Sequence, residues 1–256
     1  MSLIQVEEIR KVYRIEQEKV VALNRINITI EEGEICCILG TSGSGKSTLL
    51  NIMAGLEKPS KGRVIIDGVD VTALSEQALA LFRQKNIGFV FQSYNLMPTL
   101  TAIENVAMPL MFRGIPKAER NREAVKMLRA VNLGQRLSHR PTQMSGGQQQ
   151  RVGIARAFVA HPKIIFADEP TGNLDTKTTK EVMGIMVGMA RQYHETLILV
   201  THDRDIASYA DRIITIVDGN IKSDCTNESI VPAFVQEPEQ PQDVQPKKAL
   251  AGGNRK

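Results

Sequence analysis

Cysteine is scarce in this sequence of 256 residues, which contains three copies. Cys36 and Cys37 are adjacent within an apolar run, and Cys225 stands alone toward the C-terminal end. This spacing excludes a disulfide framework and matches no common metal-binding pattern. We therefore interpret the first two as small buried apolar residues and the third as a lone thiol. The pattern indicates a reducing, cytoplasmic setting.

Long hydrophobic runs are also missing. The best ones, residues 35–39 and 213–217, are far shorter than the roughly 20 residues that a membrane-spanning helix needs. Residues 1–10 carry acidic side chains and lack the apolar core of an export signal. We expect neither a membrane span nor a signal peptide, so any work at a membrane depends on a partner.

Charge of one sign is not concentrated along most of the chain. The formal net charge is +4 and the pI is about 9.0, yet acidic and basic residues are interspersed. A basic pI is compatible with nucleic acid or an anionic membrane as partner, but the mixing favours an ordinary solvated surface. No nucleic-acid partner is expected.

The first part of the chain has the pattern of an α/β phosphate-binding unit. Short alternating runs in residues 3–30 predict an N-terminal antiparallel β region. The continuous apolar run 35–39 predicts a strand buried on both faces. A glycine-rich turn and an apolar-periodic helix starting near Ser47 follow it. Strand, glycine loop and helix in this order predict a core with a parallel sheet.

The middle of the chain is predicted to be mostly helical from about 93 to 143, with one helix that Pro116 can start. Strand patterns return at 164–167, 197–200 and, more weakly, 212–217. We predict one domain over 1–225, with a core of 1–92 and 158–225 and a helical lobe at about 93–157. Residues 226–256 are too polar to fold alone; a docking peptide at 230–235 is the alternative to disorder there.

The glycine-rich turn fits the P-loop pattern G-x-x-x-x-G-K-[ST] with Gly40, Thr41, Ser42, Gly43, Ser44, Gly45, Lys46 and Ser47. Glycines let successive backbone N–H groups point at phosphate oxygens, and the following helix adds its positive dipole end. Lys46 can reach the β- and γ-phosphates, and the Ser47 hydroxyl can bind Mg²⁺. The alternative, a merely flexible glycine turn, does not explain the strand and helix on either side.

Two carboxylates end the apolar run 164–167. Asp168 and Glu169 would reach the ligand crevice of a parallel sheet from there. In that position Asp168 holds magnesium, and Glu169 polarises the attacking water as general base. Alone, such a pair is often a solvated turn; together with the P-loop, it indicates nucleotide hydrolysis.

A third motif, Ser145, Gly146, Gly147 and Gln148, precedes a predicted helix. Ser145 is a good N-cap, and the two glycines expose backbone N–H groups at the helix start. A plain helix cap explains the serine. It does not explain two glycines followed by three glutamines.

The order of these three motifs resembles the ABC transporter nucleotide-binding domain over about residues 3–222. The resemblance implies ATP and Mg²⁺ as ligands and a head-to-tail homodimer. In such a dimer Ser145, Gly146, Gly147 and Gln148 would contact the partner's nucleotide. It also implies Gln92 as a glutamine that touches Mg²⁺ near the permease, His202 as a γ-phosphate contact and Asp175 in a loop crossing the dimer interface. The resemblance also implies that Thr48 binds the nucleotide, next to Ser47.

Tyr13 resembles the aromatic residue that stacks on adenine in this family. A half-buried strand tyrosine is the alternative interpretation. Two positions depart from the family pattern: Thr41 stands where proline is common, and Met144 replaces the usual leucine before Ser145. Neither departure removes a needed donor, acceptor or charge, so a competent ATPase is expected.

Further stretches resemble one branch of the family, that of lipoprotein-releasing, macrolide- and peptide-exporting and cell-division ATPases. They are residues 91–96, 104–106 with 109–110, and 167–175. The branch implies a separate integral-membrane permease with a large extracytoplasmic domain, and a place at the cytoplasmic face of the membrane. Three functions remain open: driving an exporter of peptides, lipoproteins or hydrophobic drugs; transmembrane signalling to an outside enzyme; and a soluble ATPase acting on DNA or the ribosome. Against the third, the chain lacks a long coiled coil and a second cassette.

Overall fold

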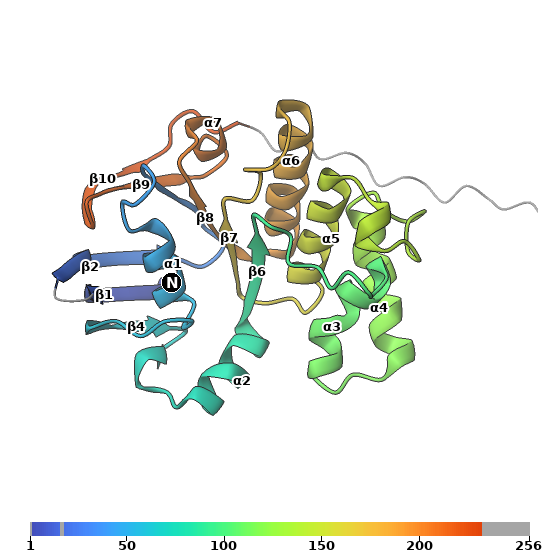
Figure 1. Ribbon diagram of the computed structural model, residues 1–256, viewed down its shortest axis with the longest axis horizontal. Coiled ribbons are helices and arrows are strands. Elements are labelled where there is room, and N and C mark those ends of the chain that lie inside the picture. The colour runs from blue at the N-terminus through green and yellow to red at the C-terminus, as the bar shows by residue number, and fades with distance from the viewer. Residues whose placement is uncertain (1, 16–17, 232–256) are drawn as a thin grey trace, which may run out of the picture.

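The computed structural model describes residues 2–15 and 18–231, which form two sheets and two groups of helices (Figure 1). The elements are β1 (Ser2–Ile15), β2 (Glu18–Glu31), β3 (Ile35–Leu39), α1 (Lys46–Met53), β4 (Lys61–Ile66), β5 (Val69–Asp70), η1 (Val71–Ala73), α2 (Glu76–Asn86), β6 (Ile87–Phe91), α3 (Ala102–Phe112), α4 (Lys117–Ala130), η2 (Pro141–Gln143), α5 (Gly146–Phe158), β7 (Ile164–Asp168), α6 (Thr176–Tyr193), β8 (Thr196–Thr201), α7 (Arg204–Ala207), β9 (Arg212–Val217) and β10 (Asn220–Thr226).

The larger sheet has the order β10-β9-β3-β8-β7-β6. Its strands β9, β3, β8, β7 and β6 are parallel, and β10 joins the edge antiparallel to β9. The smaller sheet, β2-β1-β4-β5, is antiparallel throughout. The predicted fold class, an α/β core with an N-terminal antiparallel region and an inserted helical lobe, is confirmed.

Alternate residues of the parallel strands face two separate cores, as the period of a strand requires. Cys37 and Ile165 pack with the helices α3–α6, whereas Cys36 and Phe166 pack with the antiparallel sheet, α1 and α2. Figure 1 shows α3, α4 and α5 on one side of the molecule and β1, β2 and β4 on the other. The parallel sheet is buried between them, which explains its continuous apolar runs.

The helical stretch differs in detail from the prediction. Helices occupy 102–112 and 117–130, but residues 93–101 and most of 131–140 form loops and turns. Pro116 is the N-cap of α4, as its position suggested. Most residues of these loops are polar. The chain bends at Tyr94 and Asn95, both of which have positive φ. The lobe's boundaries at 93 and 157 stay predictions.

The C-terminal part of the core contains a strand that the sequence patterns did not predict. Strand β10 follows the turn at Asp218 and Gly219, in a part of the chain that was predicted as core but not as a strand. Its pattern has one partly buried apolar residue, Ile221, because an edge strand needs few buried contacts. Asn227 still bonds the backbone of Asp211, so ordered contacts continue past 225. The predicted disordered tail and the docking peptide otherwise lie outside the described residues, which end at 231.

Candidate functional site

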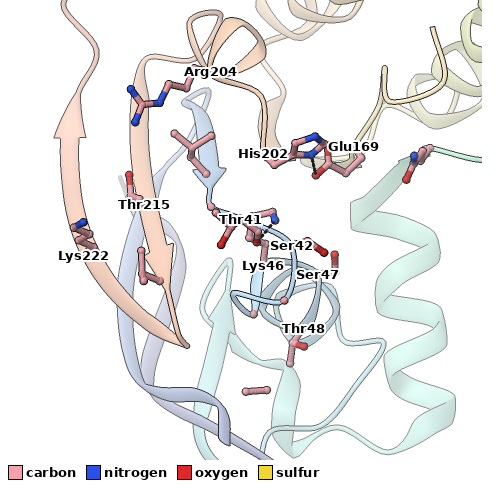
Figure 2. A pocket seen from close by; sticks show the side chains of 17 residues that line it. Thr41, Ser42, Lys46, Ser47, Thr48, Glu169, His202, Arg204, Thr215 and Lys222 are labelled. Carbon is pink, nitrogen blue, oxygen red and sulfur yellow. Dashed lines mark hydrogen bonds and ion pairs between the residues drawn. The ribbon is translucent and has the colours of Figure 1, made fainter.

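The glycine loop lies at the C-terminal end of β3 and borders a cleft of about 810 Å³. Figure 2 shows this loop below Glu169 and His202, which reach the cleft from the ends of β7 and β8. A parallel sheet brings these strand ends to one edge, which is where such folds bind ligands. The lining also contains Gly40, Thr41, Ser42, Gly43, Gly45, Lys46, Ser47, Thr48 and Gln92.

Two glycines of the loop approach other backbone so closely that a side chain would clash. A Cβ on Gly40 would lie 2.4 Å from Ile216 O, and one on Gly45 would lie 2.5 Å from Ala22 O. Gly45 also has φ 103°, a conformation that other residues rarely adopt. The loop's shape therefore depends on glycine at these two positions.

Donors in this loop suit an anion. Lys46 is 7% exposed, and its Nζ donates to Thr41 O at 2.9 Å. The Ser44 hydroxyl is buried and, within the described part of the chain, has no hydrogen-bond partner. No side chain caps the first turn of α1, which starts directly after Gly45. Free N–H groups at a helix start, a cation and an orphan hydroxyl together fit the phosphates of a nucleotide.

A magnesium ion would find its ligands beside the loop. Ser47 Oγ donates to Asp168 Oδ1 at 3.3 Å, which joins a hydroxyl and a carboxylate across the start of α1 and the end of β7. Burial raises the pKa of Asp168, so a nearby cation would favour its ionised form. The described residues hold no cluster of three His, Cys, Asp or Glu. That donor set fits Mg²⁺, which binds one or two carboxylates and completes its shell with phosphate and water.

Glu169 is held in an unusual backbone conformation, with φ 44°. Its Oε1 lies 2.9 Å from His202 Nδ1, and Thr201 Oγ1 donates to its Oε2 at 3.1 Å. Positive φ in a residue other than glycine is uncommon and costs energy, and such strain clusters at active sites. The geometry therefore presents one carboxylate, supported on both oxygens, at the wall of the cleft.

Gln92 lies at the end of β6 and lines the same cleft. Asn173 Nδ2 donates to Gln92 O at 3.1 Å, so the loop after β6 is tied to the loop after β7. A Cβ on Gly172 would lie 2.8 Å from Gln92 Nε2, which shows how closely the two loops pack. The sequence placed Gln92 at a strand end; the structure adds its contact with the residues after Glu169.

The other predicted positions do not line the cleft. Ser145 caps α5 and shares a capping box with Gln148, while a Cβ on Gly147 would lie 2.3 Å from Thr178 Cγ2. The first turn of α5, which also contains Gly146, therefore packs on the start of α6. Asp175 caps α6, where it accepts from Lys177 N at 3.1 Å and Thr178 N at 3.0 Å. These residues are brought together with one another, away from the glycine loop.

Tyr13 also lies outside the lining of the cleft. Its half-buried ring stands beside Lys11, whose Nζ is 5.1 Å from the ring centroid. The hydroxyl donates to Glu57 Oε2 at 2.8 Å, and burial is the main cause that raises the pKa of Tyr13. The phenol is also within hydrogen-bonding reach of Thr48, which places Tyr13 next to α1.

Sequence reasoning missed the far wall of the cleft. Ala22 on β2, Thr215 on β9, Lys222 on β10 and Arg204 on α7 all line it. In Figure 2, Arg204, Thr215 and Lys222 lie across the loop from Glu169. Only Arg204, two residues after His202, had a local signal. Thr215 and Lys222 reach the site because β9 pairs with β3 and β10 with β9, whereas Ala22 comes from the other sheet. A strand's neighbours are not written in its own pattern.

A family model described as ABC transporter matches residues 23–172, which is more than half of the chain. The chain belongs to the ABC transporter family. It is an ATP-binding cassette, an ATPase whose ligands are ATP and Mg²⁺. The predicted family is thereby confirmed.

Similar proteins include exporters of the predicted branch. The chain is 50% identical over 228 residues to the macrolide export ATP-binding/permease protein MacB of Brucella melitensis, and the match covers 89% of this chain and 35% of that protein. The chain thus spans about a third of the length of the MacB relatives it matches. It is 46% identical to the lipoprotein-releasing system ATP-binding protein LolD of Geobacter metallireducens, and the match covers 87% of this chain and 99% of that protein.

Solved structures of cassettes have the same fold. A dimeric, post-hydrolysis structure of the ATP-binding cassette MJ0796 bound to ADP and Pi superimposes with a TM-score of 0.81 and 41% identity. The match covers 88% of this chain and 98% of that one. None of the helices among the described residues is long and apolar enough to cross a bilayer.

Proposed function

We propose that this chain is the ATP-hydrolysing subunit of an exporter. It dimerises around Mg-ATP at the cytoplasmic face of the membrane and drives a separately encoded integral-membrane permease that has a large extracytoplasmic domain. The observation that supports this proposal most directly is a single cleft, which is lined by Lys46, Gln92, Glu169 and His202 from four separate parts of the chain. The names of the relatives favour a macrolide, a lipoprotein or a similar amphipathic molecule as cargo.

In this proposal the glycine loop and Lys46 bind the β- and γ-phosphates, while Ser47, Asp168 and Gln92 hold the magnesium. The ion supplies positive charge to the phosphate oxygens. Lys46 already points along the loop toward Thr41 O, and phosphate oxygens would take over that contact. Tyr13, beside α1, stacks on the adenine, and Thr48 contacts the nucleotide from the first turn of α1.

Glu169 acts as general base. It accepts a proton from the water whose oxygen bonds to the γ-phosphorus, as the bond from that phosphorus to the bridging oxygen breaks and ADP leaves. His202 contacts the γ-phosphate and orients Glu169 through the 2.9 Å contact with Oε1. General base catalysis contributes roughly 10²- to 10⁴-fold to such rates.

A second copy completes the site. Ser145, Gly146, Gly147 and Gln148 do not line the cleft of their own chain, which supports the proposal that they contact nucleotide held by the partner. Asp175 lies at the start of α6, beside that loop, and would follow the same dimer interface. The dimeric MJ0796 structure is the precedent among similar proteins.

Replacing Lys46 with alanine tests the phosphate contact. Lys46→Ala removes the buried cation from the loop, so we expect hydrolysis to be abolished and nucleotide affinity to fall. Steady-state phosphate release and titration with a fluorescent ATP analogue measure the two effects. Lys163→Ala, which removes a surface lysine bonded to Asp67, is the matched control. Near-normal turnover of Lys46→Ala would exclude the proposed site.

Replacing Glu169 with glutamine tests the base and the dimer together. Glu169→Gln keeps the size of the side chain but cannot take a proton, so it should bind ATP, stall before hydrolysis and accumulate as an ATP-held dimer. Light scattering with and without Mg-ATP measures the mass. A monomer with bound ATP means that dimerisation needs the permease, and rapid hydrolysis means that the base is misassigned.

The same variant identifies the partner. We would capture ATP-bound Glu169→Gln from gently solubilised native membranes and identify the proteins that copurify by mass spectrometry. A stoichiometric permease with a large outer domain is the expected result. Capture of a cell-wall hydrolase or its regulator with that permease would favour the signalling alternative. Recovery of ribosomal or DNA-bound proteins alone would overturn the exporter assignment.

A further inference from the structure

Thr201 is a buried threonine at the end of β8, directly beside the proposed base. Strands β7 and β8 are parallel, with Asp168 paired to Val200, so Glu169 and Thr201 are the next residues on each strand. Glu169 N donates to Val200 O at 2.9 Å, which joins the ends of strands β7 and β8 at this point. Thr201 is 2% exposed. Its side chain is therefore held by both its backbone and its surroundings.

The hydroxyl of Thr201 has a defined direction. Asp203 N donates to Thr201 Oγ1 at 3.0 Å, and Thr201 Oγ1 lies 3.1 Å from Glu169 Oε2. A threonine hydroxyl has a single hydrogen, and an N–H group cannot accept it. That hydrogen is therefore donated to the carboxylate of Glu169.

The two oxygens of Glu169 have partners of different kinds. His202, the partner of Oε1, has a side chain that is 65% exposed, so water competes for that contact. The partner of Oε2 is buried, and hydrogen bonds to a charged group are stronger where water is excluded. Of the two contacts, the one from Thr201 restrains the carboxylate more firmly.

We infer that Thr201 is a positioning residue for hydrolysis, which holds Glu169 Oε2 so that Oε1 stays at the wall of the cleft beside His202. The inference rests on the proposed function, in which Glu169 is the base. Thr201 is not among the residues that line the nucleotide cleft. Its loss should therefore affect the chemical step and leave nucleotide binding in place.

The test compares three variants of the full chain. Thr201→Val keeps the shape and removes the hydroxyl, whereas Thr201→Ser keeps the hydroxyl. Thr196→Val is the matched control: Thr196 lies on the same strand, is 0% exposed, and its hydroxyl accepts Gly33 N at 2.9 Å. Both valine variants thus lose a buried acceptor of a backbone N–H, but only Thr201→Val also loses a donor to Glu169.

We expect Thr201→Val to lower kcat by roughly 10- to 100-fold, since small misplacements of a catalytic group have effects of this size. The KM for ATP should change by no more than about twofold, because the substitution removes no contact with bound ATP. Thr201→Ser should recover most of kcat, and Thr196→Val should keep it. Wild-type kcat in Thr201→Val, or a Thr201→Ser variant no better than Thr201→Val, would overturn the inference.

A second measurement separates positioning from structural damage. In the Glu169→Gln background, Thr201→Val should leave the yield of ATP-held dimer unchanged, because binding and folding do not depend on that hydrogen bond. A lost dimer would mean that Thr201 supports the loop as a whole, which contradicts the inference. Rapid turnover of Glu169→Gln itself would instead remove the proposed base. If Glu169→Gln stalls before hydrolysis but Thr201→Val turns over ATP normally, the proposed function stands and only the positioning role of Thr201 is rejected.

Discussion

Glu195 is a buried carboxyl, 4% exposed, between α6 and β8. Neither of its oxygens has a hydrogen-bond partner among the described residues, and the imidazole Nδ1 of His161 lies 3.7 Å from Oε1. Burial raises the pKa of Glu195 to about 8, and burial is also the main cause that lowers the pKa of His161. Near pH 7 both groups are therefore mostly neutral, and this contact is not an ion pair.

Glu195 should make the protein less stable as pH rises. Its folded pKa lies above the ordinary value of 4.5, so between about pH 4.5 and 8 the unfolded chain binds fewer protons than the folded one. The free energy of unfolding then falls through this window, by about 5 kcal/mol at most. Urea denaturation of wild type and Glu195→Gln at pH 5 and pH 8.5 measures the difference.

The glutamine variant has no carboxyl to titrate, so it should lose this part of the pH dependence. Glu76→Gln is the control, since Glu76 has a side chain that is 76% exposed. Equal pH dependence in wild type and Glu195→Gln would show that Glu195 stays ionised in the folded protein.

At the scale of the element, α3 and α5 start with the same device. Thr101 and Glu104 form a capping box at α3, and Ser145 and Gln148 form one at α5. Each box satisfies two backbone N–H groups that the first turn leaves open. The serine of the family's glycine motif therefore has a structural role within its own chain. This contribution to helix stability is separate from the proposed contact with the partner's nucleotide.

The two capping residues can be compared by alanine substitution. Ser145→Ala and Thr101→Ala should each lower the free energy of unfolding by about 1 kcal/mol, the usual cost of a lost N-cap. Only Ser145→Ala should also reduce ATPase activity, at temperatures where both variants are folded. Chemical denaturation and phosphate release provide the two readings. Equal loss of activity in both variants would mean that the lost helix cap alone explains the effect of Ser145→Ala on ATPase activity.

At the scale of the molecule, the described chain is held together beyond the predicted boundary of 225. Thr226 pairs with Arg212, and Asn227 Nδ2 donates to Ser208 O at 3.2 Å and to Ala210 O at 2.8 Å. Val231 N donates to Ser208 O at 3.0 Å. These bonds fasten the segment after β10 to α7 and the start of β9.

Two truncations follow from these contacts. Ending the chain after Val231 should leave ATPase activity and stability unchanged. Ending it after Cys225 should keep turnover at low temperature but lower the free energy of unfolding by roughly 1–3 kcal/mol, because several partly buried hydrogen bonds are lost. Thermal denaturation measures the stability of the two truncated chains, and phosphate release measures their ATPase activity. A large loss of activity after removing 232–256 alone would assign that segment a function.

Much of the fold could be predicted because it depends on short patterns. The run 35–39 is β3, and the runs at 164–167 and 197–200 lie within β7 and β8. Each is a central strand buried on both faces, so almost every residue must be apolar. Strand β10 escaped prediction because an edge strand on the surface has no such requirement. The loop at 93–101 was taken for helix because periodicity alone does not mark where a helix starts.

The sequence by itself determined the family and the identity of the glycine loop and the two carboxylates, because those depend on residue type at fixed spacing. Only the tertiary structure decided which residues meet. It paired Asp168 with Ser47, set Thr201 against Glu169, and brought Lys222 across the cleft. The physical reason is that hydrogen bonds and clefts depend on the order and register of strands. Long-range pairing sets both, and no local pattern encodes it.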